Sequence, residues 1–210
     1  MTGEFGVSYY LKQPVFDLLV DRAPVTLTLA AGALIVTVVV GLTLGVLAAL
    51  KPNGWLDRFA LSFGTAAQAI PNFWLGLILI ILLGVMFPIL PVSGDTSWKH
   101  FVLPCLVLGT SSVPQVLRLT RTGMIEVLGS DYIRTARAKG FRPRQILFHH
   151  ALRNALLPVV SVIPIQIGYK LGGSVIFETV FALYGLRRLA YEYLPGADVP
   201  TVQMLVFFFA

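Results

Sequence analysis

Long apolar blocks alternate with short polar stretches along the chain. The first block, residues 25–50, runs for about 26 residues without a charge, which is enough to cross a hydrocarbon layer of about 30 Å with some tilt. Further apolar blocks cover residues 73–87, 101–117 and 159–181, and another begins at residues 201–210. The pattern predicts an all-α, polytopic transmembrane bundle with about four full spans and the start of a fifth.

Prolines divide two of these blocks. Pro71 separates a lead-in at residues 59–70 from the span at 73–87, and Pro104 and Pro114 interrupt the third block. A break inside a membrane frees backbone groups that need polar surroundings. The polar residues beside Pro71 therefore favour a break that lines a pathway, and a simple helix kink is the alternative.

Glycines at regular spacing indicate where helices approach closely. Gly41 and Gly45 form a small-xxx-small step that Ala49 continues, which favours close packing of another helix on this face. Glycines that simply face lipid are the alternative. A second close-packing face is predicted in the fourth span, from Gly168, Gly172 and Gly173.

Residues 1–24 differ from the rest of the chain. They are mixed polar and aromatic, which predicts an outer-side or interfacial N-terminal segment with a short interfacial helix at residues 14–24. Residues 25–210 are expected to form the transmembrane domain, with residues 118–158 as a cytoplasmic loop inside it.

The most polar part of that loop is residues 130–158. Gly140 divides it into two short helices: Ser130 or Asp131 is placed to cap the first, and Pro143 suits the first turn of the second. The second helix is expected to be amphipathic. Its predicted apolar face consists of Phe148, Ala151, Leu152, Ala155 and Leu156, and its polar face of Gln145, His149 and Arg153.

The composition indicates a membrane protein, and the distribution of basic residues predicts its orientation in the membrane. The chain is 56% hydrophobic and 12% charged, with a mean hydropathy of +0.80, whereas soluble domains carry about 25% charged residues. Half of the 16 basic residues lie between Arg118 and Arg153. The loop at residues 51–58 and the region at 118–153 fall on one side of the predicted spans and carry ten basic residues, whereas the loops at 91–100 and 182–200 fall on the other side and carry three. The excess of positive charge places the Gly140 segment in the cytoplasm.

Motifs of common enzymes do not occur in the sequence. It contains no GxxxxGK[ST], HExxH or GxSxG pattern, so we expect a non-catalytic chain that binds no cofactor. His149 and His150 point about 100° apart on a helix and do not predict a metal site.

The basic segment has three interpretations: binding of anionic lipid, of nucleic acid, or of a cytoplasmic protein. Flanking spans disfavour nucleic acid, and a glycine at a fixed place favours protein docking.

The basic segment, SDYIRTARAKGFRPRQILFHHALRNALLP, resembles the cytoplasmic loop of ABC importer permeases of the dipeptide, oligopeptide and nickel family. That loop is usually written Glu-Ala-Ala, three variable residues, then Gly. The corresponding positions here are Arg134, Thr135, Ala136 and Gly140. The usual Leu-Pro further on appears as Leu152-Arg153. These departures are similar to the form RTARAKG…HALRNALLP of one of the two paired permeases, and the resemblance extends from about residue 5 to residue 203.

The resemblance implies a function for the whole chain. It implies a type I importer permease in the bacterial inner membrane that forms half of a translocation pathway for peptides. Implied partners are a second homologous permease, two cytoplasmic ATPase subunits that hold ATP and Mg, an extracytoplasmic substrate-binding protein, and membrane lipid. The residues expected to couple to the ATPase are Tyr132, Arg134, Thr135, Ala136, Arg137, Gly140 and Phe141.

Polar residues within the spans are candidates for the translocation pathway. They are Gln68, Pro71, Asn72, Gln166, Lys170 and Glu178. A lysine at the centre of a span costs roughly 2.5 to 3.5 kcal/mol. Lys170 is therefore expected to face a cavity or a partner, or to extend its amine towards a membrane surface.

Two parts of the chain depart from the family pattern. In the outer loop at residues 182–200, Tyr184 replaces the usual proline and Arg187 replaces a glycine. In the resembling family a first span and an outer domain come before the present N-terminus, so a chain that begins late and ends inside its last span is expected.

An inactive permease fragment is one alternative function. A secondary transporter or channel without an ATPase is another, which would be expected to show inverted repeats or a row of intramembrane charges.

Overall fold

The computed structural model describes residues 7–8, 12–94, 97–171, 175–186, 200–201, 203–204 and 206, with the side chains of 175–177 left out. Among these residues every regular element is a helix, apart from one isolated antiparallel bridge between Val7 and Pro14. The all-α prediction is confirmed. The predicted outer loop at residues 182–200 and the predicted fifth span at 201–210 lie largely outside the described residues.

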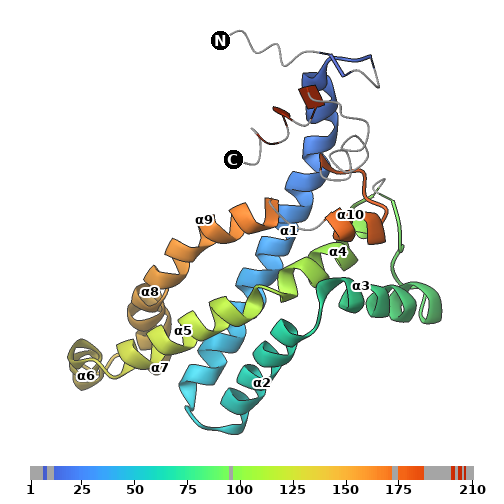
Figure 1. Ribbon diagram of the computed structural model, residues 1–210. Helices are drawn as coiled ribbons and strands as arrows, with labels where there is room; N and C mark the ends of the chain where they lie inside the picture. Colours follow the sequence, from blue (N-terminus) through green and yellow to red (C-terminus); the bar gives the residue numbers. More distant parts are fainter. Residues whose placement is uncertain are drawn as a thin grey trace, which may run out of the picture. The chain divides into compact units, whose positions relative to one another are not determined.

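The helices follow one another with short connections (Figure 1). In chain order they are α1 (Val15–Leu50), α2 (Trp55–Ala69), α3 (Asn72–Ile80), η1 (Ile81–Met86), α4 (Trp98–Thr110), α5 (Val113–Leu128), α6 (Asp131–Ala138), α7 (Pro143–Gln145), η2 (Ile146–Ala151), α8 (Leu152–Ala155), α9 (Leu157–Leu171) and α10 (Val175–Val180). The two elements η1 and η2 are π-helical, with wider turns than an α-helix.

One described helix, α1, is by itself long and apolar enough to cross a membrane. Three bent pairs meet the same criteria if each counts as one broken span: α2 with α3–η1, α4 with α5, and α7–α8 with α9. The described residues therefore hold up to four spans. The break predicted at Pro71 is confirmed, because α2 ends at Ala69 and Pro71 immediately precedes α3.

The first helix is longer than predicted. In place of a short interfacial helix followed by a span from residue 25, α1 runs without interruption from Val15, with Pro24 inside it. Proline removes one backbone hydrogen bond from a helix. Here the first turns are held by packing, since the side chains of Val15 and Leu18 are buried.

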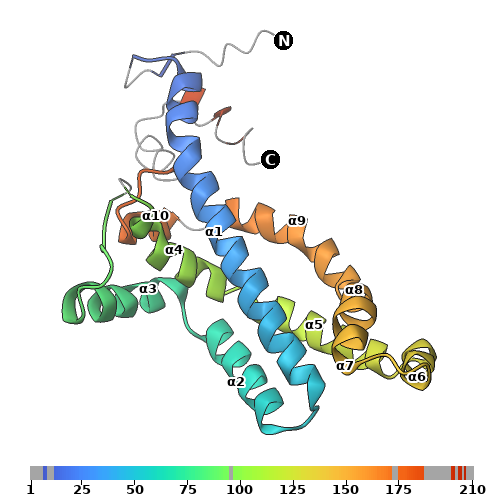
Figure 2. The ribbon, with the colours of Figure 1, turned by 180° about the vertical axis from the view of Figure 1, so that it is seen from behind.

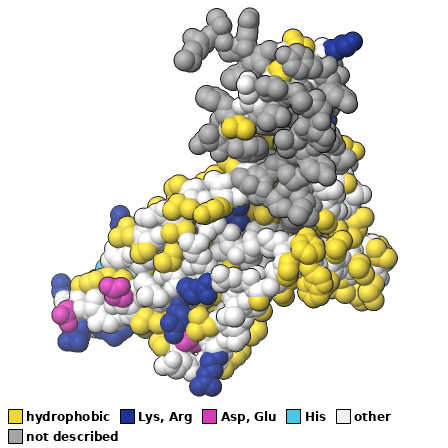
Figure 3. Space-filling model, viewed as in Figure 1, with side chains coloured by type: hydrophobic (Ala, Val, Ile, Leu, Met, Phe, Trp, Pro, Cys, Tyr) yellow, Lys and Arg dark blue, Asp and Glu magenta, His cyan; other side chains and the backbone are white. Residues whose placement is uncertain are grey.

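The chain divides into two compact units, each described here by itself. Unit 1 comprises Met1–Ala33, Pro71–Leu108 and Ile167–Ala210. Its core cluster contains Leu29, Ala33, Leu103, Cys105, Val107, Leu108, Phe181 and Leu183. Side chains on α3 and η1 remain exposed, including Phe73, Trp74 and Ile81, and Figure 3 shows hydrophobic side chains gathered over this part. Such a surface suits contact with lipid.

Unit 2 comprises Leu34–Ile70 and Gly109–Gln166. The second half of α1, α2 and α5 lie side by side in both ribbon views (Figures 1 and 2). Beneath the short helices lies a core cluster of Ala49, Met124, Ile133, Ala136, Ile146, Ala151 and Ala155. Small residues dominate this cluster, so the helices approach one another closely.

The glycine face predicted on α1 packs against α5, which confirms close packing over lipid exposure. A Cβ atom added to Gly41 would lie 2.7 Å from Val116 Cγ1, and one added to Gly45 would lie 2.8 Å from the carbonyl oxygen of Leu117. The second predicted glycine face stays a prediction: among the described residues, nothing lies within 4 Å of a Cβ atom added to Gly168. Gly172 and Gly173 lie outside the described residues.

These two glycines give a matched pair of substitutions. Gly45→Ala is expected to destabilise the chain by about 1 to 3 kcal/mol, because the new methyl group would push against the α5 backbone. Gly168→Ala is expected to be neutral or slightly stabilising, since alanine favours the helix and the site is open. Thermal denaturation of both variants in detergent checks this; equal effects would contradict the packing of α1 on α5.

The two short helices predicted around Gly140 are both present. The backbone at Gly140 has φ of +79°, a left-handed conformation that favours glycine. The predicted side-chain cap of α6 is wrong: Ser130 occupies the N-cap position, but its hydroxyl donates to the carbonyl oxygen of Val127. Asp131 is already the first residue of the helix.

The second helix is amphipathic, but its apolar face differs from the prediction. Ala151 and Ala155 are buried as expected, whereas Phe148 is 58% exposed and Ile146 is buried instead. The reason is η2: in a π-helical turn, residues five apart share a face, as Ile146 and Ala151 do. The predicted polar face of Gln145, His149 and Arg153 is exposed.

Candidate functional site

The Gly140 turn and its two helices present most of the predicted coupling residues on the surface of unit 2. The side chains of Tyr132, Arg134, Thr135, Arg137 and Phe141 are exposed, and Gly140 is exposed as well. Figure 3 shows basic side chains gathered over this part and over the turn between α1 and α2. The arrangement offers a cationic, partly aromatic surface to a partner.

One predicted coupling residue is placed differently. Ala136 is 7% exposed and packs in the core cluster with Ile133. Its methyl group therefore seats α6 on the helices beneath. A small residue is needed because a longer side chain would lift α6 away from this core.

Two side-chain contacts hold the segment around Gly140 together. The Asn154 side-chain amide donates a hydrogen bond to the Tyr132 hydroxyl at 2.8 Å. The rings of Phe141 and His150 meet edge to face, with centroids 5.4 Å apart, a favoured aromatic geometry. The Asn154–Tyr132 bond links α8 to α6 across the Gly140 turn, whereas the Phe141–His150 contact holds the residue after Gly140 against η2.

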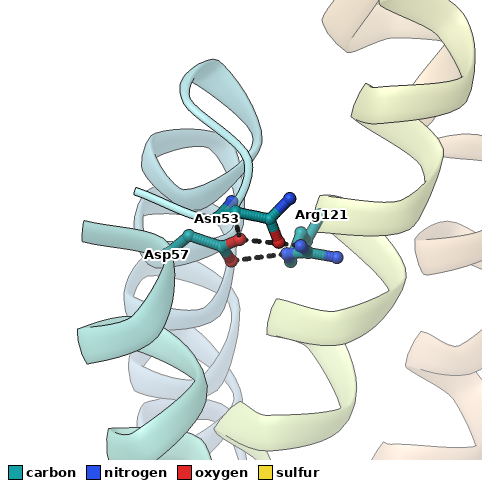
Figure 4. Close-up of polar contacts among 3 residues, drawn as sticks. All are labelled: Asn53, Asp57 and Arg121. Carbon is teal, nitrogen blue, oxygen red and sulfur yellow. Dashed lines mark hydrogen bonds and ion pairs between the residues drawn. The ribbon is translucent and has the colours of Figure 1, made fainter. Parts of the chain in front are cut away.

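A buried ion pair fastens the α1–α2 turn to α5 (Figure 4). Arg121 Nε lies 2.6 Å from Asp57 Oδ1, and its Nη2 donates to Asp57 Oδ2 at 2.7 Å. The backbone N–H of Asn53 donates to Oδ2 as well, at 2.7 Å. Asp57 is 1% exposed, so its charge is satisfied by these three bonds instead of by water.

Sequence reasoning missed this pair. It placed both partners on the same side of the membrane, in the loop at residues 51–58 and in the basic region, but had no signal that they meet. A single acid in a turn of basic and polar residues was the available hint. Arg121 lies on the helix that leads directly into α6, so the pair ties the end of the first span to the helix that carries the Gly140 unit.

The predicted pathway residues in unit 2 have polar partners on α5. Arg118 Nη2 donates to Gln68 Oε1 at 2.9 Å, and the Gln166 amide donates to Gln115 Oε1 at 2.5 Å. Gln115 and Arg118 are one helical turn apart and both are exposed. Together they form a polar row that continues on α5 from Arg121.

The predicted pathway residues in unit 1 include two buried charged side chains, Lys170 and Glu178. Lys170 is buried and its amine donates to the carbonyl oxygen of Leu108 at 3.1 Å, and Glu178 is buried beside Gly185. Pro71 precedes the first turn of α3 and Asn72 begins it. Lys170 is therefore buried with its amine on a backbone carbonyl, and its place in the pathway stays a prediction.

The described residues hold no group of three or more His, Cys, Asp or Glu side chains that could share a metal ion. His149 is exposed on the polar face of η2, while His150 contacts Phe141. Cys105 is buried in the core of unit 1.

Comparison of the sequence with known proteins identifies the family to which the chain belongs. Residues 41–210 match the family described as "Binding-protein-dependent transport system inner membrane component". The glutathione transport system permease protein GsiC of Escherichia coli K12 is 37% identical over 208 residues, which covers 99% of this chain and 68% of that protein. The dipeptide transport system permease protein DppB of the same strain is 38% identical, with 97% of this chain and 69% of that protein covered.

Solved structures confirm the fold prediction. A chain of the MetNI methionine ABC transporter, in an inward facing conformation, matches with a TM-score of 0.72 at 22% identity, over 92% of this chain and 88% of that chain. An amino acid ABC transporter with histidines matches with a TM-score of 0.65 at 15% identity, over 92% and 86%. At these identities the likeness concerns the fold alone.

Proposed function

Because the chain belongs to the family of binding-protein-dependent transport system inner membrane components and is a permease component of an ABC importer, we propose that its cargo is peptides. The observation that carries this proposal is the 37% and 38% identity, over nearly the whole chain, to permeases named for glutathione and dipeptide transport. Both named cargoes contain peptide bonds. Polar amides such as Gln68 and Gln166 suit passing peptide groups, since each offers donors and an acceptor.

The proposed mechanism is alternating access in the cytoplasmic membrane. This chain supplies half of the pathway and a second, similar permease supplies the rest. Two ATPase subunits hold ATP and Mg, close on ATP binding and move the Gly140 unit, while an extracytoplasmic binding protein delivers the peptide. The exposed coupling residues, the bond that joins α6 to α8 and the contact that holds Phe141 on η2 support this role. Coupling requires only that docking differs in strength between the two states.

The test is reconstitution of the importer with its second permease, ATPase subunits and binding protein in liposomes. Uptake of a labelled dipeptide, of glutathione and of nickel is measured with and without ATP. We expect uptake of a peptide that requires ATP. If only nickel is taken up in an ATP-dependent way, the proposal of a peptide cargo is wrong. Peptide uptake driven by an ion gradient without the ATPase would favour a secondary transporter.

Lys170 gives a further prediction. We expect Lys170→Met to reduce peptide uptake several-fold, because the Leu108 carbonyl loses its donor and the pathway loses a charge. Tyr169→Phe is the matched control, because that side chain is 73% exposed on the same helix. Uptake is compared per folded importer. Normal uptake of every peptide by the methionine variant would remove Lys170 from the pathway.

A further inference from the structure

Unit 2 contains a cavity of about 410 Å³ beside the Gly140 turn. Its apolar walls include Leu50, Leu128, Ile146 and Leu147, and its polar groups include Arg137 and Arg144. Leu50 is the last residue of α1, and Leu128 is the last residue of α5. The cavity therefore forms where two long helices end and the short helices turn back.

The two arginines in the cavity wall lack a countercharge within the described part of the chain. The ion pairs found there join Arg121 to Asp57 and Arg134 to Asp131, and neither involves Arg137 or Arg144. Two guanidinium groups against an apolar wall suit a ligand with an anionic head and an apolar body. Inorganic phosphate would satisfy only the charges and leave the apolar wall uncovered.

The position of the cavity along α1 points to the source of such a ligand. α1 is the helix that is by itself long and apolar enough to cross a membrane, and Leu50 is 48% exposed at its end. The next residue, Lys51, is the first charge after the apolar run of residues 25–50, and a basic residue at such an end is typical of the boundary between hydrocarbon and head groups. The excess of basic residues on this side places it at the cytoplasmic leaflet, whose anionic lipids attract basic pockets between membrane helices.

We propose that this cavity binds one anionic phospholipid, with the phosphate between Arg137 and Arg144 and the acyl chains along Leu50 and Leu128. The inference goes beyond the proposed function, because it does not depend on which cargo is carried. It adds a regulatory partner: a lipid seated here contacts the turn that is proposed to transmit ATPase motion, so lipid composition sets how firmly that turn is held.

The test measures retained lipid directly. The assembled importer is purified in mild detergent from a mixture of phosphatidylglycerol and phosphatidylethanolamine, and native mass spectrometry counts the phospholipids that stay bound. Arg144→Gln is compared with Arg142→Gln, a matched control because Arg142 is exposed two residues away and does not line the cavity. Leu50→Glu is the second variant, since it adds a negative charge at an exposed wall position.

We expect wild type and Arg142→Gln to retain one phosphatidylglycerol, and Arg144→Gln to retain about fivefold less, from the loss of one cationic contact. Leu50→Glu is also expected to retain less phosphatidylglycerol, because the new carboxylate repels the anionic lipid. Equal retention in wild type and Arg144→Gln would overturn the proposal, as would equal retention of the two lipids. Retention only after the ATPase subunits are removed would show that the cavity is an ATPase contact. None of these outcomes depends on peptide uptake, which tests the proposed function separately.

Discussion

Gly140→Pro is expected to abolish ATP-driven uptake while leaving membrane insertion intact. Gly140 has φ of +79°, whereas proline is locked near −65°. The substitution also removes the N–H that donates to the carbonyl oxygen of Arg137 at 3.0 Å. Both changes redirect the chain between α6 and α7 and cost about 3 kcal/mol or more at the turn. Uptake into liposomes and ATPase capture in pull-downs should both fall to background.

Two milder substitutions at the same position separate backbone conformation from size. A Cβ atom added at Gly140 would meet nothing within 4 Å, so side-chain volume is tolerated. Gly140→Asn should retain most uptake, because asparagine adopts a left-handed backbone conformation more readily than other non-glycine residues. The uptake of Gly140→Ala should lie between that of Gly140→Asn and that of Gly140→Pro. Wild-type uptake by the proline variant would show that the left-handed backbone at Gly140 is not needed for transport. Equal loss of uptake in the proline, asparagine and alanine variants would show the same.

Asp57→Ala is expected to give the largest loss of stability in the basic part of the chain. Removal of this carboxylate leaves Arg121 without its bidentate partner and the Asn53 N–H without its acceptor. Arg121 is largely buried, with 22% of its side chain exposed. Breaking such a pair costs about 2 to 3 kcal/mol, because the remaining charge stays away from water. Thermal denaturation of the purified importer measures the loss.

The chain offers a matched control for this ion pair. Asp131 and Arg134 lie 3.3 Å apart, but their side chains are 92% and 79% exposed, so Asp131→Ala should leave the melting temperature unchanged. The double variant Asp57→Leu with Arg121→Met should recover much of the loss, since no charge is then stranded. A melting temperature for Asp57→Ala equal to that of Asp131→Ala would show that the buried pair is unimportant.

Features with strong local signals could be predicted from the sequence. The span at residues 25–50, the break at Pro71 and the two short helices around Gly140 each depend on a run of apolar residues, a proline or a glycine. Such signals act through the residue's own backbone or through simple partition into lipid. The close packing at Gly41 and Gly45 was also predictable, because small residues four positions apart favour the close approach of a second helix.

Features that depend on contacts distant in sequence could not be predicted. Pro24 suggested a boundary, but burial of Val15 and Leu18 carries α1 past it. Phe148 was assigned to the apolar face on α-helical spacing, and the π-helical turn moves it to the surface. The Asp57–Arg121 pair joins residues 64 positions apart, and no periodicity reveals such a contact.

The exposed surface around Gly140 is proposed to dock on an ATPase subunit, and cross-linking tests this directly. The chain has one cysteine, the buried Cys105, so a Cys105→Ser background allows single cysteines to be placed at Arg134, which does not line the cavity, and, as a control, at exposed Ser93 in the loop predicted on the opposite side. Membrane vesicles that contain the assembled importer are treated with a short thiol-reactive cross-linker. We expect a cross-link to the ATPase from position 134 that changes in yield with ATP, and none from position 93. No cross-link from position 134, or equal cross-linking from both positions, would show that this surface does not dock on the ATPase.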